Sequence, residues 1–225
     1  MRASSQHKVI FTYQLLPSRL CNFLCQAYLP ALADLTSLTS LVAIYSHTLK
    51  SAVTLSELAK KTLSLPSPPS VYHDRGGESG DLKALLARPD VDAVIVALPI
   101  TVQPDVIRSA LSHGKHVLSE KPIAPSVSDG LELINEYEMQ WKGKVIWRVA
   151  ENMEAEPSYR KVGELVKGGK IGKVIWWKLT AVSRLSKDSQ WYKTPWRTVP
   201  EVRYSVLSRE NVAHSSAVPR RFLGV

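Results

Sequence analysis

One lysine stands where residue type and spacing favour proton-transfer chemistry. Lys121 lies in the tripeptide Glu120-Lys121-Pro122, directly after the apolar run 116–119. A partly desolvated lysine can lose or donate its proton and can hydrogen-bond a substrate oxygen. The alternative is a solvated lysine at a strand end beside a structural proline. Position alone leaves both interpretations open, although open α/β sheets bind ligands beyond the carboxyl ends of their strands.

A second polar pair follows the next apolar run, which covers residues 145–149. If both runs are strands of one parallel sheet, Glu151 and Asn152 face the same ligand side as Lys121. The alternative is a helix-entry turn in which one of these two side chains hydrogen-bonds backbone groups.

Strands and helices alternate along residues 41–149, and this alternation positions both polar segments. Short apolar runs typical of strands lie at 41–45, 71–72, 91–98, 116–119 and 145–149. Helical patterns precede or separate them, at 27–35, 51–61, 81–86, 103–113 and 126–141. The run 91–98 is continuously apolar, as in a strand that is buried on both faces. The predicted fold class is therefore α/β, with a doubly wound, Rossmann-like parallel sheet.

A different pattern follows residue 150. A helix is predicted from Pro157 to Lys167, because Gly168 and Gly169 end it. The segment 173–182 alternates imperfectly between apolar and polar residues, which fits an exposed antiparallel strand better than a buried parallel one. It predicts the start of an incomplete α+β domain.

Composition excludes several classes of function. The formal net charge is +9, but residues 1–33 and 202–225 each carry three of these charges, so no nucleic-acid surface is predicted. No apolar run approaches the roughly 18 residues of a membrane helix. Cys21 and Cys25 have helical spacing, yet no neighbouring His or Asp completes a metal site, and no metal is predicted.

Several segments together resemble the glucose-fructose oxidoreductase / inositol dehydrogenase (GFO/IDH/MOCA) family. The resemblance runs from Leu29 to Pro200 and rests on the segments 29–32, 42–46, 90–94, 114–122, 150–152 and 169–174. Members of this family are nicotinamide-dependent oxidoreductases of sugars and polyols. The resemblance therefore implies NADP or NAD as cofactor and a small-molecule substrate.

The resemblance also implies roles for individual residues. Lys121 assists hydride transfer, while Glu120 and Pro122 hold its loop and help to bind the cofactor. The cofactor crevice is lined by Ala97, Leu98 and Pro99, the adenosine ribose is read by Ser46 and His47, and the substrate is contacted by Asn152. Ser46 is neutral and does not repel a 2′-phosphate, which tilts the expectation toward NADP.

Two departures from the family pattern stand at the ends of the chain. The family opens with a strand and a glycine-rich turn, but no glycine precedes Gly76 here. Residues 9–15 could still form a strand, although they do not lead into the required turn. If the first strand is lost, the sheet is predicted to have a gap or an extra edge. His214 lacks the glycine and acidic context of the family's catalytic histidine. A truncated or mis-spliced oxidoreductase accounts for both departures, with a non-catalytic nucleotide- or partner-binding remnant as the alternative.

The predicted organisation has four parts. Residues 1–26 form an atypical N-terminal segment, and residues 27–150 a dinucleotide-binding domain without the glycine-rich turn. Residues 151–201 begin the α+β substrate domain, and residues 202–225 are an irregular basic tail. The predicted location is cytoplasmic, with mitochondrial import as the alternative because the first residues are basic and contain Ser but no acid. A homo-oligomer is compatible with the family but has no support in the residues.

Overall fold

The structure is a computed structural model, and it describes residues 6–13, 21–75, 77, 80–176, 178 and 180. For residues 21–26 and 154 it describes the backbone only. The chain divides into two compact units, residues 1–149 and residues 150–225. The expected division into four parts stays a prediction.

The first unit is built on a six-stranded parallel sheet with the order β3-β2-β1-β4-β5-β6. Its strands are β1 (His7–Tyr13), β2 (Thr39–Ser46), β3 (Ser70–His73), β4 (Ala93–Ala97), β5 (His116–Ser119) and β6 (Trp147–Val149). The strand order reverses at β1, between β2 and β4, as in a doubly wound fold. The predicted fold class is confirmed.

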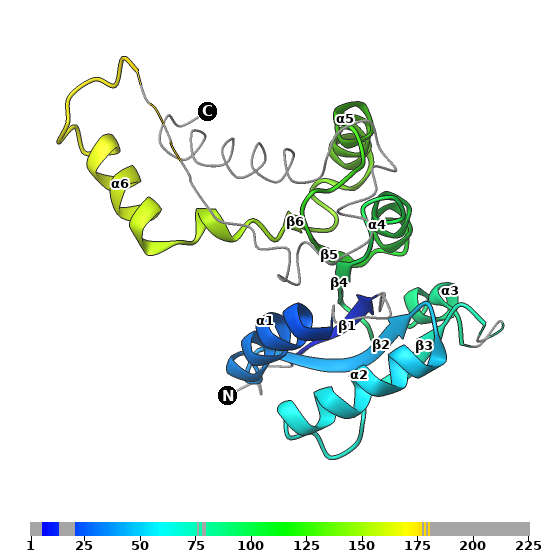
Figure 1. Ribbon diagram of the computed structural model, residues 1–225. Helices are drawn as coiled ribbons and strands as arrows, with labels where there is room; N and C mark the ends of the chain where they lie inside the picture. The colour runs from blue at the N-terminus through cyan, green and yellow to red at the C-terminus, as the bar shows by residue number, and fades with distance from the viewer. Residues whose placement is uncertain are drawn as a thin grey trace, which may run out of the picture. The chain divides into compact units, whose positions relative to one another are not determined.

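Helices cover both faces of this sheet (Figure 1). They are α1 (Cys21–Asp34), α2 (Leu49–Thr62), α3 (Leu82–Leu86), α4 (Gln103–Ser112) and α5 (Val127–Glu136), which continues as the π-helix η1 (Tyr137–Trp141). Side chains of α1 and α2 share one core with Val9, Phe11 and Ile95 of the sheet. Side chains of α3, α4 and α5 share the other core with Ile10 and Val94. Alternate residues of each strand thus enter opposite cores.

Local sequence explains where several helices begin and end. Asp81 caps α3, because its carboxylate accepts a hydrogen bond of 2.8 Å from the backbone of Ala84. Ser126 caps α5 in the same way, accepting from the backbone of Asp129 at 3.1 Å. Gly114 follows α4 with a φ of +72°, a conformation that favours glycine at the end of a helix.

The strand β1 corrects the expectation of a gap in the sheet. It lies in the middle and pairs with both β2 and β4. Its interior residues Ile10 and Phe11 are 0% and 2% exposed. The apolar strand β1 forms because β2 and β4 pair with it and helices bury it on both faces. This burial does not depend on a glycine-rich turn after the strand.

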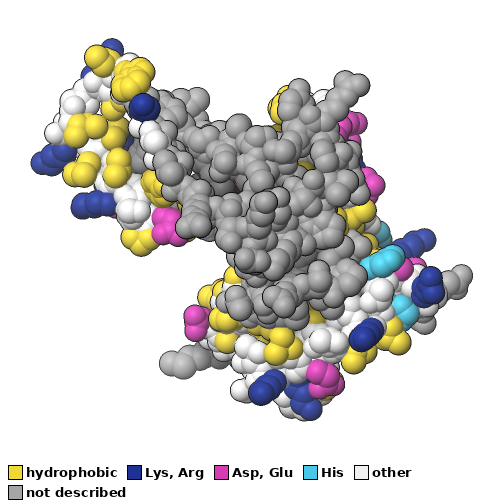
Figure 2. Space-filling model, in the orientation of Figure 1, with side chains coloured by type: hydrophobic (Ala, Val, Ile, Leu, Met, Phe, Trp, Pro, Cys, Tyr) yellow, Lys and Arg dark blue, Asp and Glu magenta, His cyan; other side chains and the backbone are white. Residues whose placement is uncertain are grey.

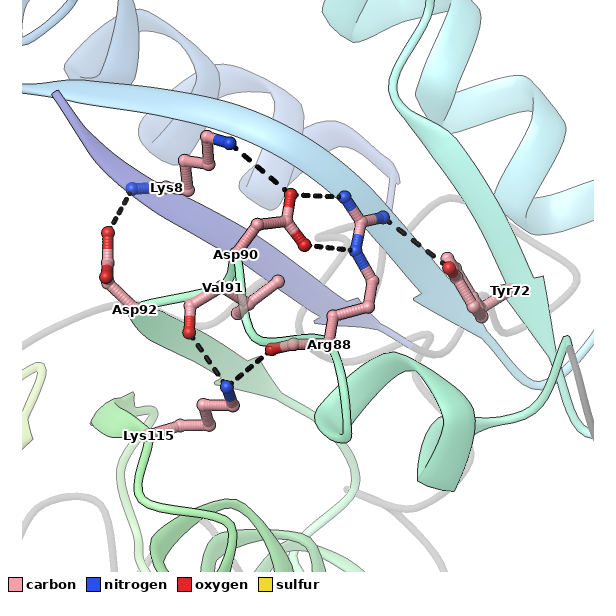
Figure 3. Close-up of polar contacts among 7 residues, drawn as sticks. All are labelled: Lys8, Tyr72, Arg88, Asp90, Val91, Asp92 and Lys115. Atoms are coloured by element: carbon pink, nitrogen blue, oxygen red, sulfur yellow. Dashed lines mark hydrogen bonds and ion pairs between the residues drawn. The ribbon is translucent and has the colours of Figure 1, made fainter.

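A network of polar contacts fixes the amino-terminal end of β1 beside the start of β4 (Figure 3). The backbone N–H of Lys8 donates to Asp92 at 2.7 Å, and its ammonium lies 3.5 Å from the carboxylate of Asp90. Arg88 binds the same carboxylate through two nitrogens, at 2.8 and 2.9 Å. These contacts fix the entry into β4 beside β1.

Lys115, which precedes β5, completes this edge from below (Figure 3). It is 7% exposed, and its ammonium donates to the carbonyl oxygens of Arg88 at 2.7 Å and of Val91 at 2.9 Å. Burial lowers the pKa of Lys115, against the opposing charges of Asp92 and Asp90. The buried lysine thus satisfies two carbonyl groups of the turn that leads into β4.

The second unit contains the 3-10 helix η2 (Asn152–Glu154) and the helix α6 (Pro157–Lys167). The predicted bounds of α6 are confirmed. The strand expected at 173–182 is not formed at the described positions 173–176, 178 and 180. An extended segment becomes a strand only with a hydrogen-bonded partner, and no described segment pairs with this one. Ile175 is 91% exposed, and Figure 2 shows hydrophobic side chains on the surface of this unit.

Within the described residues, no helix is both long enough and apolar enough to cross a membrane.

Candidate functional site

The carboxyl ends of the central strands bring most of the predicted site residues to one edge of the sheet. Tyr13, the last residue of β1, pairs with Ser46 of β2 and with Ala97 of β4. Ser119 ends β5 beside Val96. The segments that follow these strands therefore lie at the ligand-binding edge, where the sequence placed them.

The loop of Lys121 is clamped by a glutamine that the sequence did not single out. Gln103, at the start of α4, is 1% exposed, and its amide NH2 donates to the carbonyl oxygens of Glu120 and Pro122 at 2.8 Å each. The backbone N–H of Glu120 also donates to the carbonyl oxygen of Val96 at 2.8 Å. The backbone on both sides of Lys121 is therefore fixed.

The side chain of Glu120 is held as well. Tyr28 of α1 donates to its Oε1 at 2.5 Å, and the backbone N–H of Lys121 donates to its Oε2 at 3.3 Å. Burial raises the pKa of Tyr28, and the charge and hydrogen bond of Glu120 raise it further. The phenol therefore remains protonated and acts as the donor. Tyr28 was not identified from the sequence, because its partner is 92 residues away.

Lys121 itself is half-buried, and so are the last residue of β4 and the two residues that follow this strand. These are Ala97, Leu98 and Pro99, as expected for a crevice wall. The carbonyl of Pro99 accepts hydrogen bonds from Val102 and Gln103 at 3.0 and 3.1 Å, which turns the chain into α4. The turn at residues 99–103 thus forms part of the crevice wall and also positions Gln103 beside the lysine loop.

The two residues expected at the adenosine ribose have different surroundings. Ser46 is 0% exposed, and its hydroxyl pairs with that of Ser51 at 2.6 Å. His47 is exposed, and its imidazole contacts the carboxylate of Asp74, the residue after β3. The hydroxyl of Tyr45 donates to the other oxygen of Asp74. Burial raises the pKa of Asp74.

The sequence placed Asp74 in a loop and gave it no role. The only local signal was its position two residues after the short strand predicted at 71–72, since residues that follow a parallel strand lie on the ligand side.

Asn152 lies in the second unit, where it begins η2 and is exposed. The carboxylate of the preceding Glu151 accepts a hydrogen bond from the backbone of Met153 at 3.3 Å. Glu151 therefore caps a helical turn, which is the alternative given for this segment. The substrate contact of Asn152 stays a prediction.

Other predicted features lie outside the described residues. These are His214 and residue 20, the first residue of the segment 20–26 where the family's glycine-rich turn was expected. The other residues of that segment, 21–26, belong to α1. Over the part of the chain that is described, no group of three or more His, Cys, Asp or Glu side chains could hold a metal ion.

The geometry fits a dinucleotide at both of its ends. Asp74 offers a carboxylate near the ends of β2 and β3, and the lysine loop and the wall 97–99 lie at the ends of β4 and β5.

A model of the oxidoreductase family with an NAD-binding Rossmann fold, GFO/IDH/MocA, matches residues 21–146. The chain belongs to this family. The predicted family and the predicted class of cofactor are thus confirmed. The dehydrogenase FPY6 of Fusarium mangiferae is 36% identical over 180 residues, which make up 80% of this chain and 49% of FPY6.

Two solved members of the same fold resemble the chain. An oxidoreductase from Thermotoga maritima has a TM-score of 0.76 at 26% identity, covering 97% of this chain and 60% of that one. The 3-ketoreductase KijD10 from Actinomadura kijaniata, solved with NADP and TDP-benzene, has a TM-score of 0.54 at 25% identity, covering 73% of this chain and 43% of KijD10. The chain thus spans about half the length of the relatives that it matches.

Proposed function

We propose that this chain is an NAD(P)-dependent oxidoreductase. It transfers a hydride between the nicotinamide and a CH–OH group or carbonyl of a sugar, a polyol or another small substrate. The observation that carries the proposal is the lysine loop at the carboxyl edge, which Gln103 clamps on both sides of Lys121. Such fixation suits a group that must meet a reacting atom within a few tenths of an ångström.

Lys121 is the catalytic residue of this proposal. When bound, the dinucleotide accepts or supplies the hydride. In the oxidation direction the substrate carbon loses its hydrogen as a hydride, and Lys121 takes the proton of the hydroxyl group. In the reduction direction the ammonium of Lys121 returns that proton to the oxygen. The proton and the hydride together account for both hydrogens that the substrate gains or loses.

The other residues bind and orient. Ala97, Leu98 and Pro99 form the wall beside the nicotinamide half, and Glu120 and Pro122 keep the lysine loop in place. The ribose lies near His47, and Asn152 supplies a second polar contact to the substrate. This assignment is supported by the position of residues 97–99 and 120–122 at the carboxyl ends of the parallel strands, where doubly wound sheets bind ligands.

The experiment combines binding and turnover. NADH and NADPH are titrated into the purified chain by fluorescence, and turnover is followed at 340 nm with a panel of polyols and ketosugars. Lys121→Ala should retain cofactor binding and lose turnover by about 100-fold or more, the usual contribution of a positioned acid or base. Lys61→Ala, an exposed lysine in the last turn of α2, is the matched control and should retain both.

A second candidate is a non-catalytic nucleotide- or partner-binding protein of the same family. The observation that favours it is the segment 20–26, which contains no glycine where the family has its glycine-rich turn. Cofactor binding without turnover on any substrate of the panel would favour this candidate. Turnover that depends on Lys121 would exclude it.

We also propose a cytoplasmic location. A removable import sequence covering residues 1–26 would take β1 out of the centre of the sheet. Fractionation of cells that express the chain with a C-terminal tag tests this, because import would move the tag to the mitochondrial fraction.

A further inference from the structure

Two neighbouring strands bring a carboxylate to the end of β2. Ser46 of β2 pairs with His73 of β3, so the residues that follow, His47 and Asp74, lie next to each other. One oxygen of Asp74 accepts from Tyr45 and the other contacts the imidazole of His47. The carboxylate is therefore held in one orientation from two sides.

This carboxylate still has room for a ligand. The side chain of Asp74 is 38% exposed. An ionised carboxylate has about four acceptor positions, and the contacts with Tyr45 and His47 use one position on each oxygen. Asp74 can thus accept further hydrogen bonds from hydroxyl groups on its solvent side.

Ser46 cannot serve the ligand in the same way. Its side chain is fully buried, and its hydroxyl is paired with Ser51 of α2. The neutral residue that tilts the sequence toward NADP is therefore not at the surface of the site. The group that meets a ribose at the end of β2 comes from the adjacent strand.

We propose that Asp74, presented from the end of β3, binds the adenosine ribose and makes the site select NAD over NADP. This inference rests on the proposed function. A carboxylate accepts hydrogen bonds from the 2′- and 3′-hydroxyls of NAD, whereas it repels the 2′-phosphate of NADP.

Two further cations could oppose this selection. Arg75 follows Asp74 and is exposed, and Lys50 is exposed in the first turn of α2. Both would attract a 2′-phosphate if they reached it. The test therefore measures the ratio of the two affinities, and not the affinity for NADH alone.

Dissociation constants of NADH and NADPH are measured for the wild-type chain, for Asp74→Asn and for Asp34→Asn. Asp34 is an exposed acid at the far end of α1 and serves as the control for net charge. The wild type should bind NADH at least about tenfold more tightly, equal to about 1.4 kcal/mol. Asp74→Asn should reduce this ratio about tenfold or more, mainly by tightening NADPH, and Asp34→Asn should leave it unchanged.

Thermal shifts produced by each cofactor on the same variants give a second readout and show that each variant is folded. A wild type that binds NADPH as tightly as NADH overturns the inference while the proposed function stands. An unchanged ratio in Asp74→Asn does the same. If the wild type binds neither cofactor, the proposed function fails and the inference fails with it.

Discussion

Tyr28 of α1 donates a hydrogen bond of 2.5 Å to Glu120, the residue before the candidate catalytic lysine. The contact joins the first helix of the chain to the loop after β5. The ring of Tyr28 is itself fixed, because it packs edge-on against Phe11 of β1 with a centroid distance of 5.4 Å. The central strand, the first helix and the lysine loop are thus mechanically linked.

This link predicts the effect of Tyr28→Phe. The substitution keeps the ring against Phe11 but leaves one oxygen of Glu120 without its donor. A hydrogen bond to a charged group contributes about 1.5–3 kcal/mol, so the free energy of unfolding should fall by about that amount. Urea unfolding measures the change, and NADH titration should show weaker binding. An unchanged unfolding midpoint would mean that water replaces the phenol at no cost.

Gln103→Leu should loosen the lysine loop. Leucine fills a similar space in the core but donates nothing, so the carbonyls of Glu120 and Pro122 lose their donor. Each unsatisfied buried group costs about 1–3 kcal/mol, and we expect a clear loss of stability in urea together with weaker NADH binding. Gln140→Leu, at an exposed position of η1, is the matched control and should change stability by less than about 0.5 kcal/mol. Equal behaviour of the two variants would contradict the role of Gln103.

Lys115→Met should destabilise the amino-terminal edge. Methionine keeps the apolar stem, but the carbonyls of Arg88 and Val91 lose a charged donor. We expect a loss of about 2–4 kcal/mol in the free energy of unfolding, because each hydrogen bond to a charged group contributes about 1.5–3 kcal/mol and part of the desolvation cost is relieved. Lys144→Met removes an exposed lysine that donates to a single carbonyl, that of Gln140, and should be nearly neutral. Equal losses in both variants would argue against a special role for the buried lysine.

Asp90 predicts how stability depends on pH. The two-nitrogen hydrogen bond from Arg88 holds the pKa of Asp90 well below its usual range, burial opposes this shift, and the charges of Arg88 and Lys8 add to it. In the unfolded chain the pKa is about 3.9. The stabilisation is therefore present above about pH 4 and is lost as the pH falls toward the lower folded-state pKa.

Asp90→Asn should remove this pH dependence. Because the side chain of Asp90 is 37% exposed, solvent screening limits the effect to about 1 kcal/mol or less. Free energies of unfolding measured in urea between pH 3 and pH 7 give the slope for the wild type, for this variant and for Asp34→Asn. A steep acid loss that survives in Asp90→Asn would assign the effect to other carboxylates.

The sequence predicted the elements with local markers at their ends. The strand β5 and the helix α6 have the predicted bounds, because glycine and proline punctuate the chain on either side of them. The central strand β1 was harder to predict, since its place depends on pairing with β4, about eighty residues further along. The segment 173–182, where a strand was expected, alternates only imperfectly, and a hydrogen-bonded partner decides whether such a segment becomes a strand.

The candidate site shows the same division. Lys121 and its neighbours were predictable, because they follow a strand directly. Gln103, Tyr28 and Asp74 act through partners that are distant in sequence, and no local pattern reveals such contacts. Ser46 was placed correctly at the end of β2, but its burial and its pairing with Ser51 depend on how α2 packs. Sequence therefore located the edge of the site, while packing decides which side chains reach it.

The central position of β1 also has a consequence for synthesis on the ribosome. The strand that is made first receives its second neighbour only after residues 93–97 have been made. Until then β1 presents one side of unpaired N–H and C=O groups, the kind of edge that recruits other chains. At about 5–20 residues per second, this exposure lasts several seconds for each nascent chain. Chaperone depletion or faster initiation should therefore harm the yield of this protein through its first strand, before the lysine loop exists.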